Sequence, residues 1–277
     1  MKPPFPIRFP RLHALAPVLA FAALGALCTA AAADNLARAR QRGQLAVGIE
    51  HVTPPYRAGA KFRTPEGVDQ VLAEDLGRRL QLTAATRAID AAGGGRLLAD
   101  GGADLLLLAL ADGDPLHRNA TVIPTGYSAA PMAIMRTDTT IKNWTQLKGR
   151  IVCVAEGGRF AGWSAAKYGA IEQRYKAPAD ALLALRIGEC DAAVHDSALL
   201  EELIKLPEWK KFSARLPTGP KTPLVLVAPR GDPSTARFLK QAALEWRAAN
   251  MPNQVLAKAV RNIAFEVYLD QNVPDCH

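Results

Sequence analysis

Short apolar runs alternate with amphipathic stretches along most of this chain, and this alternation constrains the fold more than any other feature does. Residues 44–49 predict a buried strand, residues 68–82 an amphipathic helix, and residues 103–111 a continuous apolar strand. A strand, a helix and a strand in this order favour parallel pairing of the two strands. The pattern therefore predicts an α/β fold with a mainly parallel sheet flanked by helices.

The same pattern starts again further along the chain, after a strand at residues 131–136. The expected elements are a strand at 150–154, helices at 160–175 and 179–187, a strand at 191–194, a helix at 197–205, a strand at 224–228, and helices at 234–249 and 254–260.

We therefore predict two lobes. Lobe one comprises residues 34–136 and 224–277, and lobe two comprises residues 137–223. The polar stretch 137–143 and the Pro- and Gly-rich stretch 216–223 are the expected crossovers, which would act as hinges.

Basic residues precede an apolar run at the N-terminus. Lys2, Arg8 and Arg11 come before the run at residues 14–27, and small residues follow at 30–33. The run is shorter than the roughly 20 residues that a membrane-spanning helix needs. We predict that residues 1–33 are a cleaved secretory signal peptide and that the protein is exported to the periplasm.

The formal net charge of the chain is +8. Removing the three basic residues of the predicted signal peptide leaves about +5, by 8 − 3. Lys and Arg are scattered without a run of five or six, which argues against a nucleic-acid partner. A solvated basic face accounts for the excess.

Three cysteines follow the predicted signal peptide: Cys153, Cys190 and Cys276. Their wide spacing gives no C-x-x-C pair of the kind that holds zinc or performs redox chemistry, so we expect no metal and no cofactor. In an oxidising compartment one disulfide and one spare thiol would fit, and Cys153 and Cys190 are the candidate pair.

Several short motifs occur in an order known from one protein family. They are Gly43-Gln44-Leu45-Ala46-Val47-Gly48, Pro54-Pro55-Tyr56, Gly67-Val68-Asp69, Leu147-Lys148-Gly149-Arg150-Ile151-Val152, Glu156-Gly157-Gly158 and, most specific, Asp191-Ala192-Ala193-Val194-His195-Asp196. In these motifs the chain resembles the family 3 periplasmic solute-binding proteins of polar amino-acid ABC transporters. The resemblance implies a two-lobed type II periplasmic binding fold, a small polar ligand captured by hinge closure, a monomer, and an ABC permease in the inner membrane as partner.

The resemblance also places ligand-binding residues at the ends of strands. Tyr56 holds the place of an aromatic residue that lines the cleft in relatives, and Glu50 ends the first strand, where α/β sheets bind ligands. An aromatic face together with a carboxylate would favour a basic ligand. The alternative is that Tyr56 packs in a loop and Glu50 is solvated.

Asp196 matches an acidic residue that accepts hydrogen bonds from the ligand's α-ammonium group in the family. A buried carboxylate without a cationic partner is costly, so Asp196 either meets the ligand or caps the helix that follows. His195 would point to the other face of the strand, and it remains a candidate ligand contact or a structural histidine.

Gly157, Gly158 and Arg159 lie between a strand and a helix, where backbone amides attract an anion such as a ligand carboxylate. Relatives carry Ser or Thr at the position of Gly158. Arg159 could replace that hydroxyl group as a bidentate donor.

The segment after Asp104 departs from the family pattern. Ala111 stands where relatives have Thr, and Arg118, the candidate clamp for an α-carboxylate, comes late relative to the strand. Asp112 and Asp114 add negative charge where an amino acid would place its carboxylate. Asp112 and Arg118 are candidate ligand contacts, and a conventional α-amino acid is in doubt as the ligand.

No Ser-His-Asp, Cys-His or H-E-x-x-H pattern occurs, so we predict a binding protein without catalytic residues. Two alternatives remain open. One is a binding or adapter protein that serves a periplasmic enzyme or sensor. The other is an enzyme resembling the cyclohexadienyl dehydratases, which share this fold, with Glu50, Asp112 or Asp114 as acid or base.

Overall fold

A computed structural model describes Met1 and residues 34–52, 61–65, 67–89 and 93–271. Residues 2–33 of the predicted signal peptide, Tyr56 and Cys276 therefore lie outside the described residues.

Five strands form the sheet of the first lobe, in the order β2-β1-β3-β10-β4. Strand β1 pairs in parallel with β2 and β3, whereas β10 runs antiparallel to both β3 and β4. The sheet is thus mixed, with a parallel half and an antiparallel half. The bounds are β1 Gln44–Ile49, β2 Thr83–Ala88, β3 Leu105–Ala109, β4 Ala120–Ala129 and β10 Thr222–Pro229.

The second lobe repeats this arrangement, in the order β7-β6-β8-β5-β9. Strand β6 is parallel to β7 and β8, and β5 is antiparallel to β8 and β9. The bounds are β5 Pro131–Met135, β6 Ile151–Ala155, β7 Ile171–Tyr175, β8 Ala192–Asp196 and β9 Ala214–Arg215. Both sheets match the predicted α/β class.

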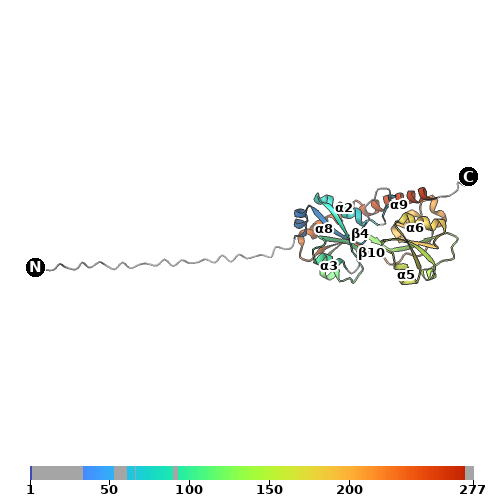
Figure 1. The fold of residues 1–277 in the computed structure, drawn as a ribbon, viewed down its shortest axis with the longest axis horizontal. Helices are drawn as coiled ribbons and strands as arrows, with labels where there is room; N and C mark the ends of the chain where they lie inside the picture. The colour runs from blue at the N-terminus through green and yellow to red at the C-terminus, as the bar shows by residue number, and fades with distance from the viewer. Residues whose placement is uncertain (2–33, 53–60, 66, 90–92, 272–277) are drawn as a thin grey trace. The chain divides into compact units, whose positions relative to one another are not determined.

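Helices flank each sheet (Figure 1). The first lobe carries α1 Asn35–Arg42, α2 Asp69–Leu80, α3 Gly94–Ala99, α4 Leu116–Asn119 and α8 Pro233–Ala248. The second lobe carries α5 Trp163–Tyr168, α6 Pro178–Ile187 and α7 Ser197–Leu203, with short 3-10 helices at Trp144–Leu147 and Pro207–Phe212. The last helix, α9, spans Met251–Asp270.

The chain passes between the sheets at two places. Strand β4 ends at Ala129 in the first sheet and β5 begins at Pro131 in the second, so the first crossover lies before the expected stretch 137–143. The apolar residues 131–135 fit either sheet by composition, and their pairing with β8 assigns them to the second. The return passage, between β9 and β10, falls within the expected stretch 216–223.

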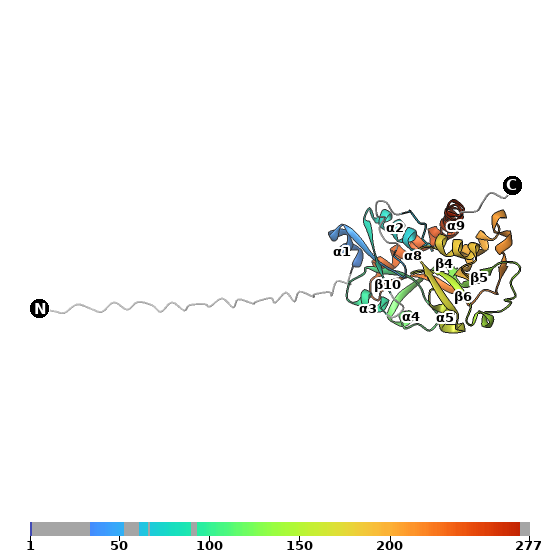
Figure 2. The same cartoon turned by 45° about the vertical axis from the view of Figure 1, so that its right-hand side comes forward.

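Helix α9 differs from the expectation that the whole C-terminal segment packs on the first lobe. It contacts α6 and α7 of the second lobe as well as α8 of the first (Figures 1 and 2). It is also much longer than the predicted helix at 254–260. Its apolar residues Leu256, Val260 and Ile263 are buried, which accounts for the side that faces the protein.

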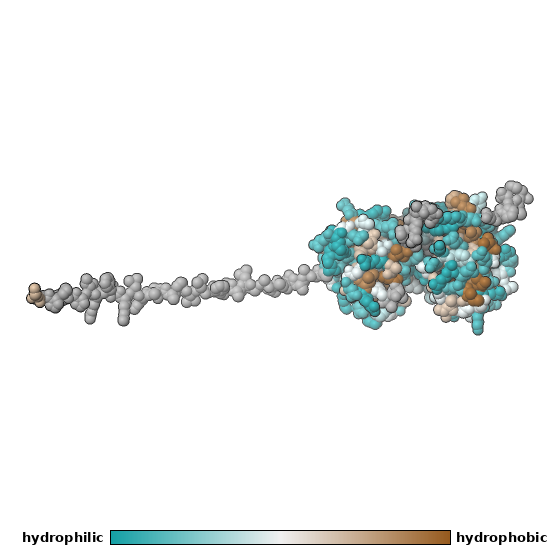
Figure 3. Space-filling view, in the orientation of Figure 1, coloured by the Kyte–Doolittle hydropathy of each residue, from teal (hydrophilic) through white to brown (hydrophobic). Residues whose placement is uncertain are grey.

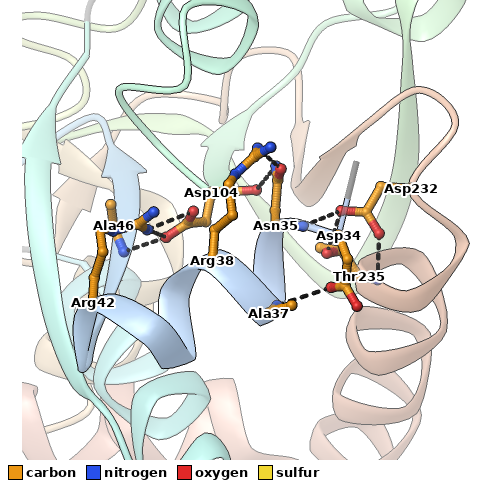
Figure 4. A network of polar contacts seen from close by, with 9 residues as sticks. All are labelled: Asp34, Asn35, Ala37, Arg38, Arg42, Ala46, Asp104, Asp232 and Thr235. Atoms are coloured by element: carbon orange, nitrogen blue, oxygen red, sulfur yellow. Dashed lines mark hydrogen bonds and ion pairs between the residues drawn. The ribbon is translucent and has the colours of Figure 1, made fainter. Parts of the chain in front are cut away.

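Polar contacts hold helix α1 against the first lobe (Figure 4). The side chain of Asp34 caps α1 by accepting from the Ala37 backbone nitrogen at 2.9 Å. The backbone nitrogen of Asn35 donates to Asp232 at 2.9 Å, and Arg42 donates to both oxygens of Asp104. These contacts join α1 to the residues that directly precede β3 and α8.

In the second lobe, Cys153 of β6 and Cys190, just before β8, form a disulfide with a Cα–Cα distance of 5.8 Å. Both residues are buried. The bond joins β6 to the segment that leads into the neighbouring strand β8, so it stabilises the second lobe internally.

The face of the molecule in Figure 3 is mainly hydrophilic, with small apolar patches. Large exposed apolar side chains on α9 are Phe265, Tyr268 and Leu269. Within the described part of the chain, no helix combines the length and the hydropathy that a membrane span requires.

Candidate functional site

Arg159 follows β6 in the second lobe, and its guanidinium group binds two carboxylates of the first lobe. Nη1 donates to Oε2 of Glu50 at 2.5 Å, and Nη2 donates to Oδ1 and Oδ2 of Asp69 at 2.9 and 3.0 Å. The side chains of Arg159 and Asp69 are only 11% and 6% exposed. Charge-assisted hydrogen bonds in a largely dry environment thus join the two lobes.

The ends of two elements position these carboxylates. Glu50 directly follows β1, and its Oε2 also accepts from the backbone nitrogen of Ala109, at the end of β3, at 2.9 Å. Asp69 is the first residue of α2, where the positive end of the helix dipole favours a negative charge. Both therefore lie at the carboxyl edge of the parallel strands, where ligands of α/β proteins bind.

A second polar contact crosses between the lobes near the first crossover. The hydroxyl group of Tyr127 in β4 donates to Oδ2 of Asp196 at the end of β8, at 2.7 Å. Oδ1 of Asp196 accepts from the backbone nitrogen of Ala198 and so caps α7. Asp196 therefore makes the predicted helix cap and also lines the pocket described below.

Burial and neighbouring charges shift the pKa values of these groups. Burial raises the pKa of Glu50 and of Asp69, while the charge of Arg159 lowers both pKa values in part. Burial alone would lower the pKa of Arg159, but the facing carboxylates, Asp69 first, raise it above its usual value. Burial, and then the charge of Asp196, raises the pKa of Tyr127. The guanidinium group therefore stays charged and the phenol stays a neutral donor at physiological pH.

A small pocket lies among these side chains, and its lining residues come from both lobes: Glu50, His51, Gly67, Asp69, Arg159 and Asp196. Its free volume is about 10 Å³, roughly the space that one water molecule needs. Three carboxylates face one guanidinium group here, so the surroundings favour a cation over an anion.

The two glycines before Arg159 allow the backbone of the second lobe to lie close to the first lobe. Gly157 has a φ of +71°, which favours glycine, and a Cβ atom there would overlap the imidazole of His51 in the first lobe. The backbone nitrogen of Gly158 donates to the Ala155 carbonyl at 3.0 Å. That amide closes a turn, so it is not directed at an anion as the sequence suggested.

Three other predicted ligand contacts, Asp112, Arg118 and His195, are not among the described residues that line the pocket. Asp112 and Arg118 are exposed. His195 is fully buried in β8, where it pairs in register with Met132. Tyr56 falls outside the described residues.

Sequence reasoning missed four residues of this region: His51, Gly67, Asp69 and Tyr127. Asp69 carried a signal, because it belongs to the Gly67-Val68-Asp69 motif at the predicted start of a helix. Tyr127 and His51 could not be assigned to the site from the sequence, because their positions depend on how the two lobes meet.

No cluster of three or more His, Cys, Asp or Glu side chains suited to a metal ion occurs in the described ranges.

Several solved structures resemble this chain in fold. A mutant of ArgBP from T. maritima matches with a TM-score of 0.56 and 19% identity, over 82% of this chain and 99% of that chain. An ancestral cationic amino-acid solute-binding protein matches with a TM-score of 0.56 and 18% identity, over 82% of this chain and 100% of that one. An amino-acid ABC transporter substrate-binding protein from Streptococcus pneumoniae, bound to L-arginine, matches with a TM-score of 0.56 and 14% identity, over 82% and 98% of the two chains.

No protein-family model and no curated protein sequence matches this chain. The structural matches show the fold: two lobes, each with a mixed five-stranded sheet, as in the type II periplasmic binding proteins.

Proposed function

We propose that the protein is a solute-binding protein that captures a small ligand carrying a cationic group between its two lobes. The observation that carries this proposal is the pocket itself, where Glu50, Asp69 and Asp196 converge from both lobes on one guanidinium group. A ligand cation can exchange for that group without leaving buried carboxylates unpaired, which would be costly.

The solved structures with this fold support the class of ligand. The matched protein from Streptococcus pneumoniae is bound to L-arginine, and ArgBP is also matched in an arginine-bound form. Their likeness extends over most of both chains. We therefore take L-arginine as the probe, since it carries a guanidinium group of the same chemistry as Arg159.

Capture would proceed by hinge closure, with the crossovers at Ala129–Pro131 and between β9 and β10 absorbing the rotation. The predicted signal peptide supports export to the periplasm. In this proposal the closed, ligand-bound monomer delivers its ligand to an ABC permease in the inner membrane.

Calorimetric titration of the purified protein tests the binding function. We expect L-arginine to bind and L-glutamate not to bind, because the lining carries an excess of carboxylates. Asp69→Asn should weaken the binding of L-arginine, because it removes a carboxylate from the lining of the pocket. Asp100→Asn, at an exposed position outside the pocket, is the matched control. Equal binding of L-arginine and L-glutamate would contradict the proposal.

One match supports a second candidate function. An ancestral amino-acid-binding protein described as a precursor of cyclohexadienyl dehydratase matches with a TM-score of 0.56. Glu50, whose pKa burial raises, is a carboxyl group suited to proton transfer. Turnover of prephenate or arogenate by the purified protein, lost in Glu50→Gln, would favour this enzyme. Absence of turnover would leave the binding function.

A further inference from the structure

Arg159 lies in the pocket in the position that an incoming cation would take. Its guanidinium group comes from the second lobe, whereas the hydrogen-bond acceptors Glu50 and Asp69 both belong to the first. The side chain reaches across from a turn held by the hydrogen bond between Gly158 and Ala155. The contact is therefore made between lobes by groups that also line the ligand pocket.

This contact differs from an ordinary structural ion pair because it fills the ligand pocket. With Arg159 in place, the pocket has room for about one water molecule, so a ligand of amino-acid size cannot enter. The three hydrogen bonds also use oxygen atoms of both carboxylates. A ligand cation therefore has to displace the guanidinium group to take its place against both carboxylates.

We propose that Arg159 is an internal ligand: its guanidinium group occupies the Glu50–Asp69 carboxylate pair, latches the two lobes together, and must leave before an external cation binds. Because this latch controls the same cleft, it rests on the proposed ligand-binding function. The proposal adds that the Arg159 side chain competes with the external ligand for the same two carboxylates.

Other contacts between the lobes can persist when the latch opens. Tyr127 binds Asp196 beside the first crossover, and Arg63 of the first lobe pairs with Asp180 of α6 at 2.8 Å. Neither Tyr127, Arg63 nor Asp180 is among the pocket's described lining residues. These contacts would keep the two lobes aligned during opening, while the Arg159 contact determines what fraction of molecules is closed.

The latch has a quantitative consequence for affinity. A ligand that binds only the unlatched form has an apparent affinity reduced by the fraction of molecules in that form. If about nine molecules in ten are latched, removing the latch should raise the affinity for a simple cation about tenfold.

Methylguanidinium is a suitable probe, because it has the head group of arginine but no carboxylate that Arg159 could bind. In calorimetry, Arg159→Ala should bind methylguanidinium about tenfold more tightly than the unchanged protein does. Arg150→Ala is the matched control, since Arg150 pairs with Asp191 on the exposed surface of the same lobe at 3.5 Å. Equal affinity in Arg159→Ala and the unchanged protein, or binding by neither, would overturn the latch.

A second variant removes the latch from the other side and covers the case in which Arg159→Ala does not fold. The double variant Glu50→Gln, Asp69→Asn keeps Arg159 but removes the charges that hold it. We expect its radius of gyration in small-angle X-ray scattering to exceed that of the unchanged protein. An unchanged radius of gyration in the double variant would refute the latch.

The latch and the binding function can fail separately. If L-arginine does not bind the unchanged protein but Arg159→Ala binds methylguanidinium, the latch stands and the proposed function falls. If L-arginine binds and methylguanidinium does not distinguish the variants, the function stands and the latch falls.

Discussion

Asp196 illustrates how one carboxylate serves several neighbours. It accepts from the Tyr127 hydroxyl group, caps α7 through Ala198 and lines the pocket. The sequence offered ligand contact and helix capping as alternatives, but the geometry combines the cap with a place in the pocket lining. Loss of this side chain would therefore affect stability as well as binding, so an Asp196→Ala variant alone cannot isolate its role at the ligand.

Tyr127→Phe tests the link at the crossover. It removes a neutral donor from a buried carboxylate, and we expect unfolding to become easier by about 2 kcal/mol. Chemical denaturation measures this difference. Tyr268→Phe, at a 70% exposed position on α9, is the control and should leave the stability unchanged. An equal effect of the two substitutions would show that the Tyr127 hydrogen bond contributes nothing.

Residue types and local order predicted part of the site. Glu50, Arg159 and Asp196 could be selected because each ends or follows a strand, and α/β folds bring such ends together. The partner of Arg159 could not be predicted in the same way. The sequence suggested a ligand carboxylate, whereas the lobes bring Glu50 and Asp69 to it, and that encounter depends on packing between segments far apart in the chain.

At the scale of elements, two glycines explain why one predicted helix is shorter than expected. The sequence predicts a single helix at residues 160–175, but α5 covers only Trp163–Tyr168 and β7 follows. Gly162 and Gly169 adopt φ values of +89° and +70°, which end helical geometry on both sides of α5. The apolar spacing indicated a helix, and the left-handed turns interrupted it.

Helix α8 depends on a buried cap that also holds the N-terminal helix. Asp232 accepts from the backbone nitrogens of Thr235 and Asn35, each at 2.9 Å, and from the Thr235 hydroxyl group (Figure 4). Asp232→Ala should lower the free energy of unfolding by about 2 kcal/mol at neutral pH, the upper end for a helix cap. Asp100→Ala, at an exposed position, should have no such effect.

The effect of Asp232 should depend on pH. Burial alone would raise its pKa, but the hydrogen bonds from Thr235 and Asn35 lower it below the usual value. A lowered pKa in the folded protein means that the stabilisation is complete above the unfolded value of about 3.9 and is lost as the pH falls through the folded value. Denaturation of Asp232→Ala and the unchanged protein should therefore converge as the solution is acidified from pH 5. A constant difference would contradict this assignment.

At the scale of the whole molecule, the sequence predicted two α/β lobes and the return crossover, because strand and helix periodicity is local. It did not predict that β5 joins the second sheet or that α9 packs on α6 and α7. Pairing and packing of this kind are decided by competition between surfaces of similar composition. The first passage between the two sheets lies before the stretch 137–143 that the sequence indicated.

Hydrogen exchange with and without L-arginine tests the central claim most directly, because it reports on both lobes at once. Binding between the lobes should slow exchange of the backbone amides around Glu50 and Asp69 together with those around Arg159 and Asp196. Protection confined to one lobe, or confined to segments away from these residues, would contradict capture of the ligand between the lobes.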